Sequence, residues 1–213
     1  MTTVSPDWIE GLTGGAETQS SASDPHAIFS AELERIPTKM KTFLRRERAP
    51  SSFEKTWENF EGAYGRAFDK LAEDALGNWS DGQLALPLAF LCRHSIELSI
   101  KGAIVAYAES AGEAPLIEGH SLAQLWGELL RQIQAAGFII DDEWTVYCGK
   151  LVQHLHDVDP DGERFRYPTS RKGIAFDYTE VDLRGLAVAH WHVGMLCDGA
   201  IGMLDALGRQ SAG

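Results

Sequence analysis

The chain has 213 residues, 44% of them hydrophobic, and a formal net charge of −12 at pH 7. This is the composition of an ordinary globular protein, and its length suits one large domain whose core needs no disulfides. The negative charge argues against attraction of the whole surface to nucleic acid, although it leaves room for a local basic pocket.

The three cysteines, Cys92, Cys148 and Cys197, are far apart and form no C-x-x-C pair. We therefore expect reduced thiols in a cytoplasmic protein, with neither a disulfide framework nor a zinc site. The N-terminus lacks a basic region followed by an apolar run, so no signal peptide is predicted. Two apolar stretches, 86–108 and 186–207, contain charged and histidine side chains, which indicates buried helices rather than membrane spans.

The N-terminal segment, residues 1–23, is rich in Ser, Thr, Gly and Ala and is predicted to be a loose tail. Asp24 followed by Pro25 suits the start of a short helix. We expect a single helical-bundle domain over residues 24–208.

Ser51 and Glu54 form a capping box, which predicts a helix that runs to about Leu76, with Gly77 as the stop. Aromatic and aliphatic side chains recur along it at spacings of three and four, as on a helix face buried in a core. This stripe comprises Trp57, Phe60, Tyr64, Phe68 and Leu71. Pro87 suits the first turn of the next helix, which continues to about Glu109.

A second capping box, Ser121 with Gln124, predicts a third long helix. Asp141 or Asp142 is expected to start a fourth, which must stop before Pro160.

Thr179 and Asp182 predict the start of a fifth helix, which runs to about Leu207. We find no strand pattern of any length and no internal repeat. The predicted fold class is therefore all-α, a helical bundle of about five long helices.

The second of these helices carries a row of charged side chains inside an apolar stretch. Arg93, Glu97 and Lys101 share one arc of the helix, with His94 at its edge. Because apolar residues surround them, the charges form an island in a buried helix. The row has two cations for one anion, and buried charges are costly unless they are paired. Either a carboxylate from another helix or a bound phosphate must balance the remaining positive charge.

Three further features occur together in a fixed order. They are the run LCRHSIELSIKG at 91–102, the run GHSLAQLWGEL at 119–129, and Arg-Tyr-Pro at 166–168. In these features the chain resembles the HEPN superfamily, named for nucleotide binding in higher eukaryotes and prokaryotes. The resemblance covers about residues 53–207.

The resemblance implies a helical bundle, commonly a homodimer, that acts on or near nucleotides or RNA. The residues that match the family pattern are Glu97, Lys101, His120, Arg166 and Tyr167. Many members are ribonucleases of toxin–antitoxin or antiphage systems. No cofactor is expected.

The active members share an Arg-x(4–6)-His motif, and the match here is Arg184 with His190. Six residues apart on one helix, these side chains point roughly 120° away from each other and would not converge on one phosphate. We therefore expect a module that binds a nucleotide or RNA phosphate without conventional catalysis. A metal-independent ribonuclease that uses Arg184 and His190 is one alternative, and a purely structural or regulatory dimeric protein is another.

A basic run follows the fourth helix, with Arg164, Arg166, Arg171 and Lys172. One interpretation is that Arg166 pairs with Glu97 and closes the bundle. The other is that these arginines join the charged row in an anion pocket, since guanidinium groups suit phosphate geometry. The candidate anion- or nucleotide-binding residues are Arg93, His94, Glu97, Lys101, His120, Arg164, Arg166 and Tyr167.

Two further patterns bear on metal binding and on self-association. His154 and His156 diverge by about 200° on a helix, so we interpret the histidines and aspartates at 154–161 as a solvated helix end and expect no metal site. Gly194, Gly199 and Gly202 allow close approach of another helix, which makes the last helix the candidate surface for a homodimer.

Overall fold

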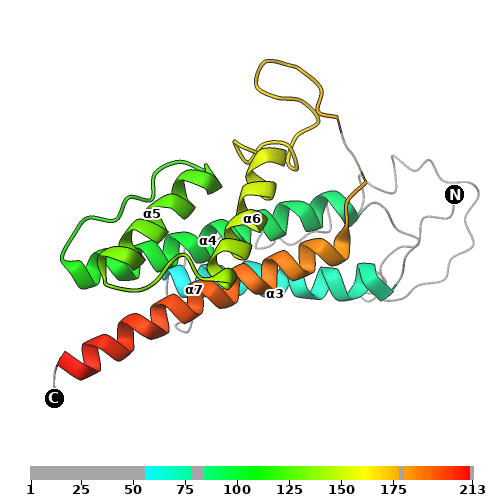
Figure 1. Cartoon of the computed structure of the whole chain (residues 1–213). Coiled ribbons are helices and arrows are strands. Elements are labelled where there is room, and N and C mark those ends of the chain that lie inside the picture. Colours follow the sequence, from blue (N-terminus) through cyan, green and yellow to red (C-terminus); the bar gives the residue numbers. More distant parts are fainter. Residues whose placement is uncertain (1–55, 78–83, 178–179, 212–213) are drawn as a thin grey trace, which may run out of the picture. The chain divides into compact units, whose positions relative to one another are not determined.

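The computed structural model describes residues 56–77, 84–177 and 180–211. These residues belong to one unit, Ser52–Gly213. The helices in them are α3 (Trp57–Gly77), α4 (Ala85–Ala111), α5 (Leu122–Ala135), α6 (Glu143–Val158) and α7 (Leu183–Ser211) (Figure 1). No strand occurs in this part of the chain, where the one β interaction is an isolated bridge between Thr169 and Ala175. The prediction of an all-α bundle is confirmed.

Two of the predicted helix starts coincide with side-chain caps. Asp142 accepts hydrogen bonds from the backbone N–H groups of Trp144 and Thr145, both at 3.0 Å, and Ser121 accepts one from Gln124 at 3.4 Å. These bonds satisfy N–H groups that have no partner within the helix.

The first and last of these helices begin later than predicted. α3 begins at Trp57, because the Thr56 hydroxyl accepts the Asn59 N–H at 3.2 Å. α7 begins at Leu183, because Asp182 accepts the Gly185 N–H at 2.9 Å. Ser51, Glu54 and Thr179, on which the earlier starts were predicted, lie outside the described residues, as do the predicted tail and the helix at Asp24.

The central element is α4, which packs against α3, α5 and α7. Its aliphatic side chains occupy all sides of the helix, and Ile96, Ile100 and Ile104 are at most 1% exposed. Each such side chain contributes roughly 1.5–3 kcal/mol when it is fully buried. The expectation of a buried central helix is confirmed, and this packing fixes the charged row deep within the bundle.

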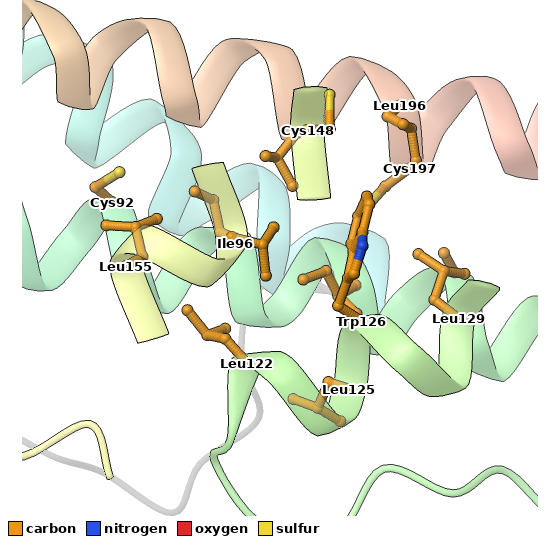
Figure 2. Packing of buried hydrophobic residues seen from close by; sticks show 14 of the residues in the cluster. Cys92, Ile96, Leu122, Leu125, Trp126, Leu129, Cys148, Leu155, Leu196 and Cys197 are labelled. Carbon is orange, nitrogen blue, oxygen red and sulfur yellow. The ribbon is translucent and has the colours of Figure 1, made fainter. Parts of the chain in front are cut away.

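The rest of the core joins α5, α6 and α7 to α4. Figure 2 shows Trp126 of α5 extending toward Leu196 and Cys197 of α7. Cys92 and Cys148 lie in the same core, and all three cysteines are free and buried. Burial raises the pKa of the Cys148 thiol to about 11, so it stays protonated at neutral pH.

The aromatic stripe of α3 is only partly in this core. Phe68 is buried and Leu71 packs against the core, but Trp57 and Tyr64 are half-buried and Phe60 is exposed. The prediction that the whole stripe is core is therefore wrong at its N-terminal end. Trp57 and Tyr64 still contact α4, since a Cβ atom built at Gly102 would lie 3.5 Å from Trp57 Cβ and the Tyr64 ring lies 4.4 Å from the His94 ring, but each ring lies at the edge of that contact and keeps one part in solvent.

Within the described residues, no helix is both long enough and apolar enough to cross a membrane.

Candidate functional site

The charged row lies in the middle of α4 and is buried. Arg93 and Glu97 are each 3% exposed, and Lys101 is 8% exposed. Glu97 accepts from both cations: Arg93 Nη1 donates to Oε2 at 3.0 Å, and Lys101 Nζ donates to Oε1 at 2.9 Å. The spacing of four residues makes these contacts possible, since it brings side chains one above another on a helix.

The remaining positive charge is balanced by Asp159. This residue follows α6, is 2% exposed, and places its carboxylate oxygen Oδ2 3.2 Å from Arg93 Nε. The network thus holds two cations and two carboxylates. The sequence left two groups that could balance the row, a carboxylate from another helix or a bound phosphate. The structure has the carboxylate. The interpretation of residues 154–161 as a solvated helix end is wrong at Asp159.

The same network joins three segments of backbone. Arg93 Nη2 donates to the His120 carbonyl at 2.6 Å and Arg93 Nε to the Asp159 carbonyl at 3.1 Å, while Lys101 Nζ donates to the Gly119 carbonyl at 2.8 Å. The charged side chains therefore attach the start of α5 and the end of α6 to α4. Hydrogen bonds to charged groups are worth about 1.5–3 kcal/mol each, so the attachment is strong.

Gly162 lets the loop after α6 approach this network closely. Its φ is +71°, and a Cβ atom there would lie 3.0 Å from Arg93 Nη1. Both the backbone conformation and the lack of space require glycine at this position. The loop consequently crosses directly over the Arg93 guanidinium.

His120 is the exposed member of the network. Its Nδ1 lies 2.9 Å from Glu97 Oε1, and its side chain is 60% exposed. Burial alone would raise the pKa of Glu97, but hydrogen bonds from Lys101 and His120 outweigh burial and hold that pKa below its usual range. Glu97 is therefore a carboxylate at neutral pH, and it orients the His120 ring.

Beside the network, α3, α4 and the loop after α6 form what we call the aromatic–arginine surface, made of Tyr64, Phe90, His94, Arg166 and Tyr167. The Arg166 guanidinium lies over the Phe90 ring at 5.9 Å and over the Tyr167 ring at 5.6 Å. His94 stacks on Phe90 with ring centroids 5.6 Å apart and meets the Tyr64 ring edge-on at 4.4 Å. Arg166 and Tyr167 are exposed.

The protonation of His94 on this surface is set mainly by burial. Burial lowers the pKa of His94, the charges of Arg166, Arg93 and His120 lower it further, and only Glu97 opposes them. His94 is therefore mostly neutral at pH 7, because burial disfavours its charged form.

Arg166 does not pair with Glu97. Its Nε donates to the Gly162 carbonyl, and among the described residues the Glu97 carboxylate is contacted by Arg93, Lys101 and His120. The interpretation that Arg166 reaches back to Glu97 and closes the bundle is wrong. Arg93 and Lys101 of α4 already saturate that carboxylate.

The rest of the basic run mostly supports the loop. Arg164 donates to the Val158 carbonyl at 2.9 Å and to the Asp177 carbonyl at 2.8 Å. Arg171 pairs with the Glu163 carboxylate. The candidate binding residues thus divide into a buried set that holds the fold and an exposed set, His94, His120, Arg166 and Tyr167, that faces solvent at least in part.

The structure does not bring Arg184 and His190 together. His190 Nε2 lies 3.0 Å from the Ser95 hydroxyl, its Nδ1 lies 3.8 Å from the Asp69 carboxylate, and Arg184 is exposed. These contacts aim the imidazole at α3 and α4.

The Ser95–His190–Asp69 arrangement was missed from the sequence, because its members are far apart in the chain. It has the residue types of a catalytic triad, but Ser95 is 0% exposed in the middle of α4. A substrate cannot reach that hydroxyl, so the arrangement is a buried hydrogen-bond chain rather than a nucleophile.

Comparison of the sequence with protein-family models and with curated proteins, and of the structure with solved structures, gave no match.

Proposed function

We propose that the chain is a HEPN-like helical module that binds a nucleotide or an RNA phosphate through its aromatic–arginine surface, without conventional catalysis. The observation that carries this proposal is the exposed Arg166 guanidinium held over the Phe90 and Tyr167 rings. A role in a toxin–antitoxin or antiphage system belongs to the same proposal and rests on the family resemblance, whereas a cytoplasmic location is proposed from the spacing of the three cysteines.

The chemistry of this surface suits a nucleotide. A guanidinium offers paired N–H donors to phosphate oxygens. The Tyr167 ring, 53% exposed, offers a face on which a base can stack. Stacking of one base on an aromatic side chain is worth about 1–3 kcal/mol. The two contacts together would hold a phosphate and a neighbouring base, and they would not distinguish one base from another.

In this proposal the buried row has a positioning role. The charges of Arg93 and Lys101 are matched by Glu97 and Asp159, so a phosphate would have to displace a buried carboxylate to bind them. The network instead holds the loop that carries Arg166 against α4. Fewer residues would therefore contact the ligand than the sequence led us to expect.

Fluorescence polarisation with a labelled single-stranded RNA at low salt tests the proposal, because phosphate contacts weaken steeply as salt rises. We expect Arg166→Ala and Tyr167→Ala to weaken binding about tenfold each. Arg131→Ala, which removes an exposed arginine of α5, should bind as wild type does. The proposal fails if wild type binds neither RNA nor a nucleoside triphosphate, or if Arg166→Ala and Arg131→Ala behave alike.

The same RNA also tests the ribonuclease alternative. Cleavage by wild type that is lost in both Arg184→Ala and His190→Ala, with folding retained, would establish that activity in place of simple binding. The contacts of His190 with Ser95 and Asp69 argue for the opposite result, intact RNA.

We further propose that two copies of the chain pair through α7. Val188, Trp191, Met195 and Met203 are exposed on this helix, and they recur at spacings of three, four and eight residues along one side. Nothing lies within 4 Å of a Cβ atom built at Gly199 or Gly202, so a second helix could approach closely there. An exposed apolar surface of this kind is typical of a protein–protein contact.

The charge-balanced network favours a second candidate function, a regulatory dimer without a nucleotide ligand. Melting temperature discriminates between the two, because a ligand that binds only the folded state must raise it. An increase with RNA or nucleotide supports the binding module, and an unchanged value at saturating concentrations supports the regulatory dimer.

A further inference from the structure

A cavity of about 250 Å³ lies between the end of α6, the start of α7 and the N-terminal part of α4. The nucleotide proposal makes no use of it. Most of its wall is apolar, and the side chains concerned are Ala89, Leu151, Leu155, Phe165, Leu186 and Ala189. Apolar cavities in this size range bind small molecules, since one of about 150 Å³ already accommodates benzene. The cavity therefore has room for a six-membered ring and a short polar arm.

The polar groups of the cavity are mostly acidic. Asp177, Glu180 and Asp182 line it and are exposed, so they form its solvent-facing rim, which we call the mouth of the cavity. One oxygen of the Asp182 carboxylate also accepts the Gly185 N–H at the start of α7. Among the described residues of the lining, Arg164 is the one arginine or lysine and His154 is the one histidine. Three carboxylates against one guanidinium leave an excess of negative charge at the mouth.

The Arg164 guanidinium is held in a fixed position at this mouth. Its Nη1 and Nη2 donate to the carbonyls of Val158 and Asp177, and its centre lies 5.7 Å from the Phe176 ring. A positively charged group of a ligand would thus meet carboxylates whose charge Arg164 offsets only in part. A negatively charged group would be repelled.

We propose that this cavity binds a small hydrophobic ammonium ion. Its ring or alkyl body lies among the apolar side chains, and its amine lies at the carboxylates of Asp177, Glu180 and Asp182. Burial of the apolar body supplies the affinity, and the carboxylates select the charge of the ligand. The site is separate from the aromatic–arginine surface and selects the opposite charge.

Three probes of nearly equal size and different charge test the proposal: benzylamine, which is an ammonium ion at pH 7, benzyl alcohol and benzoate. Their binding to the full chain can be measured by ligand-observed NMR. We expect the affinity to fall in that order, with no binding of benzoate. The proposal is overturned if benzylamine does not bind, or if benzoate binds as tightly as benzylamine.

Two exposed carboxylates provide a matched pair of variants. Glu180→Gln should weaken benzylamine about three- to fivefold and leave benzyl alcohol unchanged, the size of effect that a solvent-exposed charge pair supports. Asp205→Asn removes an exposed carboxylate nearer the other end of α7 and should change neither affinity. Equal benzylamine affinity in wild type, Glu180→Gln and Asp205→Asn would overturn the charge selection.

Ala189→Met tests whether the probes enter the cavity. The larger side chain fills the apolar space, so both benzylamine and benzyl alcohol should lose binding while the circular dichroism spectrum stays helical. Unchanged binding by this folded variant would show that the probes bind elsewhere. If the variant does not fold, the probe series and Glu180→Gln still decide the proposal.

Discussion

Arg93 contacts Asp159 twice, through its carboxylate at 3.2 Å and through its carbonyl at 3.1 Å, although 66 positions separate the two residues. Arg93 at the same time donates to Glu97 and to the His120 carbonyl. One buried guanidinium thus connects the middle of α4 with the start of α5 and the end of α6. The contact between Arg93 and Asp159 explains how a buried helix accommodates two cations. It also accounts for the close approach of the loop that carries Arg166.

Removal of the Arg93 guanidinium should destabilise the protein strongly. Arg93→Ala leaves the buried Asp159 carboxylate without its cation, while Glu97 keeps only Lys101 and His120, and an uncompensated buried charge costs about 3–5 kcal/mol. Urea denaturation followed by circular dichroism measures the loss in the free energy of unfolding. The matched control is Arg131→Ala, which breaks an exposed pair with Glu128 and should cost at most about 1 kcal/mol. Equal losses in the two variants would contradict the role assigned to the network.

Neutralising Glu61 should stabilise the protein. Burial and the negative charge of Asp198 raise the pKa of Glu61, while a hydrogen bond from Ser99 opposes them. A raised carboxyl pKa means that the charged form is disfavoured in the folded state, so the cost is present at neutral pH and disappears as the pH falls through the folded pKa. Glu61→Gln removes the charge and keeps an oxygen for Ser99.

Because Glu61 is half-exposed, solvent screening limits the gain at pH 7 to about 0.5 kcal/mol. The free energy of unfolding in urea at pH 7 and at pH 4 measures it, and the gain should shrink at the lower pH. Glu73→Gln, which loses an exposed pair with Lys70, should bring no gain at either pH. A less stable Glu61→Gln protein at pH 7 would refute the prediction.

The stability of the protein should fall as the pH drops below about 6.5, in part because of His190. Burial lowers the pKa of His190, and the nearby Asp69 carboxylate only partly opposes this. The unfolded chain therefore takes up a proton at a higher pH than the folded one, and stability is lost as the pH falls from the unfolded pKa toward the folded pKa. His190→Gln should flatten this dependence between pH 7 and pH 5, whereas His154→Gln, at an exposed position, should not. Parallel pH profiles for wild type and His190→Gln would exclude this contribution.

The sequence was a good guide to local structure and to the burial of α4. The Asp142 and Ser121 caps depend on neighbours two or three residues away, and such signals are visible in one sequence. The island of charge was visible for the same reason, since its contacts span four residues.

Contacts between distant segments were not visible. The sequence showed that a charge was missing from the row, but only the packing of α6 against the bundle identifies Asp159 as the residue that supplies it. The contact of His190 with Ser95 spans 95 positions, and the Glu97–His120 pair was identified only as two residues of a family pattern. Pairings of this kind depend on which helix faces pack against each other. Periodicity shows which face of each helix is apolar, but it does not show which of these faces pack together.

A charge placed on the exposed side of α7 should separate the proposed dimer. The Trp191 side chain is 61% exposed and packs against the His192 ring at 5.1 Å, so Trp191→Glu removes a large apolar contact from the surface rather than from the core. If two copies pair through this helix, the variant buries a carboxylate in the interface, and such a change costs several kcal/mol of association. Sedimentation velocity at micromolar concentration should show a dimer for wild type and a monomer for Trp191→Glu. Ile139→Glu makes the same kind of change at a 74% exposed position between α5 and α6 and should leave the dimer intact. A monomeric wild-type protein, or loss of the dimer in both variants, would exclude α7 as the specific contact.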